Sequence, residues 1–277
     1  MARSPHRTAR QRQRLLALAA LALACAKAPP HETTVLAKVP ERIVILPMNV
    51  TAPLPAELKG ESGATWSALE VYLRAHGAGL KTLAYPSARG LWLASIRDAR
   101  ADPKKKDAGF DDAARLFVAK LKEHTDFDAL VIPSLYVQRA TLSGTNARWD
   151  GAEQMLQMAE RADVQVPADA PIEGVVPAAS LHAVVFDGAG AKLHEGRAGI
   201  ALLVRGRLAR TGAPNEAPSF SFIALKEPFD RVRLVGAAAN ALAPWVPLLP
   251  AATLDQLAAR VVSEPTPATG ESEPPAP

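Results

Sequence analysis

DALVIPSLYV, at residues 128–137, is the stretch of sequence that decides the fold class. Its aliphatic and β-branched residues predict a strand that is buried on both faces of a sheet. RIVILP, at residues 42–47, has the same character and ends at a proline. Strands of this kind need cover on both faces, so we predict an α/β domain in which helices pack on the sheet.

Helical spacing is found around these two strands. Trp66, Leu69 and Leu73 recur at intervals of three and four residues, and Gly77 follows as a stop signal, which predicts a helix over 61–76. The same reasoning predicts helices at 87–100, 111–124, 228–242 and 254–262, and a return strand at 80–84.

The pattern becomes antiparallel after residue 137. Segments 180–186 and 192–200 flank the sequence DGAG at 187–190, which is typical of a hairpin turn. The outer edge of this hairpin is where another chain could add a strand. Residues 147–157 alternate partly and favour a strand, although a helix over 152–161 fits equally well, and we expect loops at 167–176 and 210–220. The prediction is therefore an α/β (α+β) fold, with a mixed sheet, packed helices and an antiparallel hairpin in a single domain at 41–262.

The first 25 residues have the pattern of an export signal. Five arginines without any acidic residue precede LLALAALALA at 15–24, and the only cysteine of the chain follows at Cys25. This apolar run is too short to span a membrane as a helix but fits a signal peptide. LALAC, at 21–25, resembles a bacterial lipobox, although ordinary cleavage after Ala24 would leave Cys25 as a free thiol. We predict a signal peptide at 1–24, a lipid on Cys25 and a membrane-proximal tether at 25–40.

The signal also accounts for the basic charge of the chain. The sequence has 32 Lys and Arg against 28 Asp and Glu, and five of the basic residues precede Cys25. Removal of the signal leaves slightly more acidic than basic residues, so the mature chain lacks the charge expected of a nucleic-acid-binding protein. Residues 263–277 contain no apolar side chain larger than alanine or proline, which predicts a disordered Pro-rich tail.

The residues that could carry chemistry do not form a recognisable site in the sequence. If Asp187 pairs with Gly190, His182 lies opposite Glu195 and His194 lies on the other face, so the two imidazoles do not converge. Two histidines are in any case too few for a closed zinc site. We therefore predict no catalytic residues, no metal site and no cofactor.

Trp149 differs from the other tryptophans because its neighbours are polar. It is followed by Asp150 and preceded by Arg148. We predict that Trp149 is exposed and that Trp149, Arg148 and Asp150 contact a partner protein. Asp150 and Glu153 would also suit a pair of catalytic carboxylates, but acidic pairs are usually just solvated.

The order of elements is similar to that of a group of envelope proteins. The lipobox, VILPM at 44–48, DALVI at 128–132 and VVFDG at 184–188 together resemble the α/β domain shared by CsgG, the N-terminal part of TolB, and LpoB. The resemblance implies a fold and an envelope location, carries no enzymatic residues, and hints at a role in assembly.

These observations predict a protein that is not an enzyme. We expect it to be anchored by Cys25 to the periplasmic side of the bacterial outer membrane and to bind other envelope proteins. Association of the chain with itself stays open. The alternative is a periplasmic ligand-binding or hydrolytic domain with a site formed by loops at 47–60 and 138–178.

Overall fold

The computed structural model describes residues 39–101, 109–159, 173–209 and 219–262. The predicted signal peptide, Cys25, most of the tether and the C-terminal tail lie outside the described residues. The elements are, in chain order, β1 (Arg42–Ile45), η1 (Ala56–Glu61), α2 (Ser62–Ala75), β2 (Gly79–Thr82), α3 (Tyr85–Ala101), α4 (Phe110–Lys122), β3 (Ala129–Ser143), β4 (Asn146–Trp149), β5 (Ala152–Met155), β6 (Glu173–Asp187), β7 (Lys192–Leu202), β8 (Val204–Ala209), β9 (Ser219–Ala224), α5 (Arg231–Leu242) and α6 (Ala251–Ala258).

The main sheet has seven strands and is built around the long antiparallel pair β3 and β6. β1 pairs in parallel with β2 on one side and with the first residues of β3 on the other. The far end of β3 pairs with β4, and β7 pairs along β6. The mixed α/β fold with an antiparallel hairpin is therefore confirmed.

Asn49 fills the gap along β3 between β1 and β4. Its side-chain amide donates to the carbonyl oxygen of Leu135 at 2.9 Å, and its side-chain oxygen accepts from the Leu135 N–H at 2.9 Å. The amide thus takes the place of a strand backbone, in a residue that is 2 % exposed and has a φ of 59°. Asparagine tolerates this left-handed conformation better than most residues.

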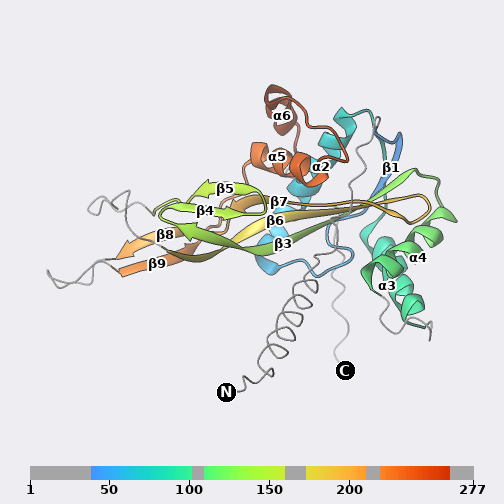
Figure 1. Cartoon of the computed structure of the whole chain (residues 1–277), viewed down its shortest axis with the longest axis horizontal. Helices are drawn as coiled ribbons and strands as arrows, with labels where there is room; N and C mark the ends of the chain where they lie inside the picture. Colours follow the sequence, from blue (N-terminus) through green and yellow to red (C-terminus); the bar gives the residue numbers. More distant parts are fainter. Residues whose placement is uncertain (1–38, 102–108, 160–172, 210–218, 263–277) are drawn as a thin grey trace, which may run out of the picture. The chain divides into compact units, whose positions relative to one another are not determined.

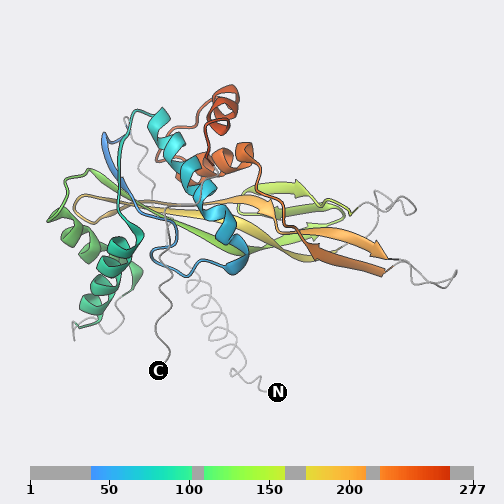
Figure 2. The same cartoon turned by 180° about the vertical axis from the view of Figure 1, so that it is seen from behind.

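Helices cover both faces of the sheet, as Figures 1 and 2 show from opposite sides. Helices α2, α5 and α6 pack on the face that carries Val131 and Leu181. Helices α3 and α4 pack on the other face, against Leu130 and Phe186. Both strand segments that the sequence predicted to be buried on two faces are covered in this way.

The ends of β3, β6 and β7 that lie away from α3 and α4 form a third, smaller core. The β4–β5 hairpin packs there, and Trp149 and Leu156 belong to the same buried cluster as Val176 and Leu202. β8 and β9 continue from β7 as a separate two-stranded antiparallel ribbon. Among the described residues, no helix is both long and apolar enough to cross a bilayer.

Three sequence predictions about elements need correction. Residues 147–157 form neither one strand nor a helix, because they contain the short strands β4 and β5. Residues 173–176, expected in a loop, begin β6, and residues 219–220, also expected in a loop, begin β9. The segment 138–178 is consequently not an irregular loop in its described parts.

Candidate functional site

Trp149 is a core residue, so the prediction that it is exposed is wrong. Its side chain is 5 % exposed, and its indole N–H donates to the carbonyl oxygen of Ala179 at 3.1 Å. A Cβ atom at Gly199 would lie 2.5 Å from the indole nitrogen, so the ring sits directly on the β7 backbone. Trp149 fastens the β4–β5 hairpin to the sheet and is not available to a partner.

The two neighbours of Trp149 have separate roles. Arg148 is exposed and forms an ion pair with Glu153 at 3.1 Å. Asp150 accepts a hydrogen bond from the Tyr136 hydroxyl at 2.7 Å. Burial, and then this contact with Asp150, raise the pKa of Tyr136 above its ordinary value. Asp150 and Glu153 are thus each engaged by a different neighbour instead of forming a carboxylate pair.

The two hairpin histidines lie on opposite faces of the sheet, as predicted, although the predicted register is wrong. His182 pairs with Arg197 and Glu195 pairs with Val184, because the turn is one residue longer than expected and a bulge follows it at Val185/Phe186. His182 still contacts Glu195 diagonally, with Nε2 and Oε1 3.2 Å apart.

Lys192 joins this pair to helix α4. Its ammonium group lies 3.1 Å from Glu195 and 3.1 Å from Asp111. Burial lowers the pKa of Lys192, but its two carboxylate partners outweigh burial and raise it. Burial lowers the pKa of His182 more than Glu195 raises it, so the imidazole is neutral near pH 7. These groups line a hollow of about 650 Å³ between the sheet, the start of α4 and Thr51.

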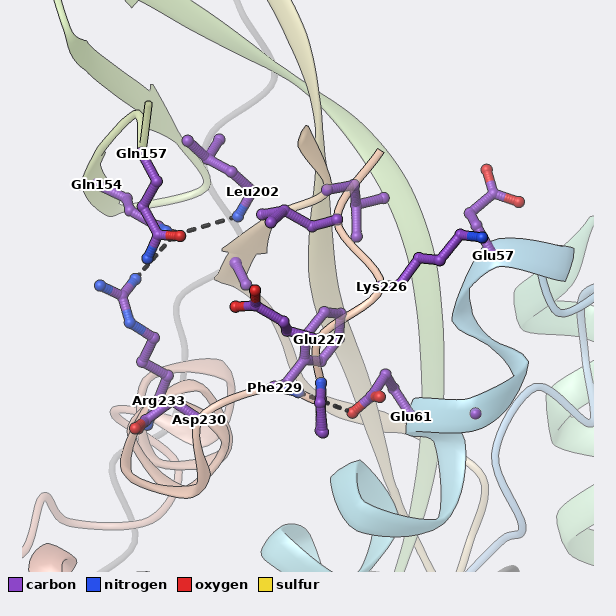
Figure 3. Close-up of a pocket in the computed structure, with 15 residues that line it drawn as sticks. Glu57, Glu61, Gln154, Gln157, Leu202, Lys226, Glu227, Phe229, Asp230 and Arg233 are labelled. Carbon is purple, nitrogen blue, oxygen red and sulfur yellow. Dashed lines mark hydrogen bonds between the residues drawn. The ribbon is translucent and has the colours of Figure 1, made fainter. Parts of the chain in front are cut away.

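A second hollow, of about 440 Å³, brings together the two segments of the alternative prediction. Glu57 and Gly60 come from 47–60, and Gln154 and Gln157 come from 138–178. The rest of the wall comes from residues 201–203 at the end of β7 and from the loop before α5, with Lys226 and Glu227. Figure 3 shows Lys226 and Glu57 on one side of this hollow and Arg233 on the other.

Hydrogen bonds hold the walls of this second hollow in place. Oε1 of Gln154 accepts from Arg233 at 2.8 Å and from the Leu202 N–H at 3.1 Å (Figure 3). Glu61 accepts from the Phe229 N–H at 3.1 Å. The Asp230 side chain caps α5 by accepting from the Arg233 N–H at 3.0 Å. The hollow therefore has fixed polar groups of both charges.

The third candidate surface is the outer edge of β9, which sequence analysis missed. β9 has the sequence SFSFIA and pairs only with β8 among the described residues. Phe222 is 41 % exposed, and the centroid of its ring lies 5.0 Å from that of Phe220 in an edge-to-face arrangement. The strict alternation of serine and phenylalanine was the signal that could have identified this strand.

Within the described residues, no three His, Cys, Asp or Glu side chains lie close enough together to hold a metal ion. Comparison of the chain with protein-family models, with curated proteins and with solved structures found no match.

Proposed function

We propose that the protein is a lipid-anchored envelope protein whose domain binds protein chains of the envelope and catalyses no reaction of its own. The anchor is inferred from the arginine-rich start, the apolar run and the lipobox-like sequence ending at Cys25. The binding role is inferred from one observation in the domain, namely that the outer edge of β9 is unpaired among the described residues.

An open strand edge offers unpaired N–H and C=O groups to another chain. The opposite side of this ribbon is already paired, because Gly206 of β8 donates to Gln157 and accepts from Ala159, so among the described residues β9 is the side that stays open. In this ribbon the edge carries no charged side chain and presents the half-exposed ring of Phe222. These are the features of a site for strand addition, in which backbone hydrogen bonds give affinity and side-chain pockets give specificity.

Photo-crosslinking in the native envelope tests this function. A photoreactive residue is placed at Ser221 on the β9 edge, and at the exposed Gln256 of α6 as the control position. We expect Ser221, and not Gln256, to give one defined protein adduct. The adduct should disappear when Ile223→Lys puts a charge beside the edge, with the unfolding midpoint unchanged.

Adducts that form equally at Ser221 and Gln256, or that survive the Ile223→Lys change, would show that β9 is not the binding surface.

The second hollow supports a second candidate function, the binding of a small zwitterion such as an amino acid or short peptide. Arg233 and Lys226 offer donors for a carboxylate, and Glu227 offers an acceptor for an ammonium group. Calorimetry with a panel of amino acids and dipeptides tests this function. Binding that is lost on Glu227→Gln and kept on Arg260→Gln, a change outside the hollow, would support it, whereas no binding across the panel would exclude it.

A further inference from the structure

The edge of β9 differs from the other sheet edges in its charge. Three of the described strands lie at an edge of the main sheet, and each of them carries at least one charged side chain. β2 carries Lys81, β5 carries Glu153, and β7 carries Lys192, Glu195 and Arg197. Charged side chains at an edge discourage pairing with another chain. β9 carries none, so among these edges it is the one without that protection.

The hydrogen bonds around β8 establish which backbone groups of β9 face outward. The Leu225 N–H donates to Leu203 at 2.8 Å, in the same register as the β8–β9 ladder. Because hydrogen-bonded pairs recur at every second residue of an antiparallel ladder, Ile223 and Ser221 also direct their backbone groups toward β8. The N–H and C=O groups of Phe220 and Phe222 therefore point toward the open edge.

Gly206 provides an independent check of this direction. It lies opposite Phe222 in the ladder. Its N–H donates to Gln157 at 2.8 Å and its carbonyl accepts from Ala159 at 2.8 Å, both on the side of β8 away from β9. Residues opposite each other in a non-hydrogen-bonded pair both point outward, so Phe222 points outward as well.

We propose that the partner of the β9 edge is β9 of a second copy of this chain, paired antiparallel about a twofold axis at Ser221. In this register Phe220 lies opposite Phe222 of the second copy, and the outward N–H and C=O groups of both residues are paired. This inference names the partner for the binding role proposed above and rests on that role.

The sequence SFSF makes the strand complementary to itself. Opposite residues of an antiparallel pair share a face of the sheet, so the four phenylalanine rings of the two copies gather on one side. The twofold axis gives two Phe220–Phe222 pairs. A register shifted by two residues would pair Phe222 with itself and leave Phe220 opposite Ala224, with one aromatic pair in place of two.

The oligomeric state of the purified chain, measured by light scattering and sedimentation over a concentration series, tests the proposal. We expect a dimer that dissociates on dilution. Ser221→Lys brings two like charges together at the axis and should raise the dissociation constant about tenfold or more. Thr82→Lys, on the β2 edge, is the matched control and should leave the dimer unchanged, and circular dichroism checks the fold of both variants.

Disulfide trapping tests the register. Ser221 would form a non-hydrogen-bonded pair with itself, at a Cα separation of about 4.5 Å, which suits a disulfide. In a chain that carries Cys25→Ala, we expect Ser221→Cys to crosslink the dimer under oxidation and Thr82→Cys not to do so.

The proposal would be overturned by a chain that remains monomeric at every concentration. A dimer whose dissociation constant is unchanged by Ser221→Lys, and that Ser221→Cys does not crosslink, would overturn it as well. If β9 crosslinks to a different protein while the purified chain stays monomeric, self-pairing fails and the binding function stands. If neither crosslink nor dimer involves β9, both fail.

Discussion

Gly196 allows helix α5 to approach strand β7 closely. A Cβ atom at this position would lie 2.2 Å from the carbonyl oxygen of Ala241, so any side chain would push the helix away from the sheet. We predict that Gly196→Ala destabilises the domain by roughly 1–3 kcal/mol, the usual cost of overpacking a core. Urea unfolding measures this change.

Gly236, within α5, is the matched control. Apart from the neighbouring residues and backbone of its own helix, no atom lies within 4 Å of a Cβ placed there. Alanine is favoured over glycine inside a helix, so Gly236→Ala should stabilise the domain by up to about 1 kcal/mol. Equal effects of the two substitutions would contradict the close packing of α5 on β7.

His194 is a buried histidine that must stay neutral. Its Nε2–H donates to the carbonyl oxygen of Ala241 at 2.8 Å, and its Nδ1 is buried without a hydrogen-bond partner. Burial lowers the pKa of His194 more than this hydrogen bond raises it. The pKa of His194 is therefore lower in the folded chain than in the unfolded chain, so the unfolded chain takes up a proton there at a higher pH. The stability that is present above about pH 6.5 is consequently lost as the pH falls below this value.

His194→Gln removes this titration and keeps a donor for Ala241. We predict that the loss of stability between pH 7.5 and pH 5.5 becomes smaller in this variant, as measured by urea unfolding at both values. An undiminished dependence in His194→Gln would contradict the assignment.

At the scale of elements, the sequence predicted those strands and helices that have strong periodicity. The strand predicted at 42–47 and the helices predicted at 61–76 and 111–124 match β1, α2 and α4 closely. The strand predicted at 128–137 matches the first part of β3, which continues to Ser143. The faces of His182 and His194 were also predicted correctly. Side chains alternate between the two faces of a strand, so a register error of two residues leaves each side chain on the same face.

Other elements could not be predicted because they depend on contacts distant in sequence. Trp149 has polar neighbours, but it is buried because β4 and β5 fold back over β7 at Gly199. The hairpin register depended on a bulge that the sequence does not mark. The hollow lined by Gln154, Arg233 and Glu61 joins four separate segments of the chain, and no single sequence motif predicts it.

The β4–β5 hairpin depends on Trp149 for its attachment. Trp149→Ala should remove the core of the third cluster and destabilise the domain by about 3–5 kcal/mol. Arg148→Ala, one residue away at an exposed position, should change stability by less than about 0.5 kcal/mol. Thermal unfolding of both variants checks this contrast. A Trp149→Ala protein as stable as the parent would contradict the burial of Trp149 and favour an exposed side chain.

At the scale of the whole molecule, the chain is proposed to combine an anchor with a domain that binds by strand pairing. Two copies held on one membrane surface meet at a high effective concentration, which favours an edge-to-edge contact that would be weak in dilute solution. The anchor and the open β9 edge are thus consistent with one another.

Attachment of a lipid to Cys25 is the central claim about where this domain acts, and mass spectrometry of the N-terminal peptide of the protein purified from bacterial envelopes tests it most directly. We predict a mature chain that begins at Cys25 with a mass raised by acyl chains, and a Cys25→Ala variant that takes up no labelled fatty acid. An unmodified Cys25, or equal labelling of the Cys25→Ala variant, would contradict the lipid anchor.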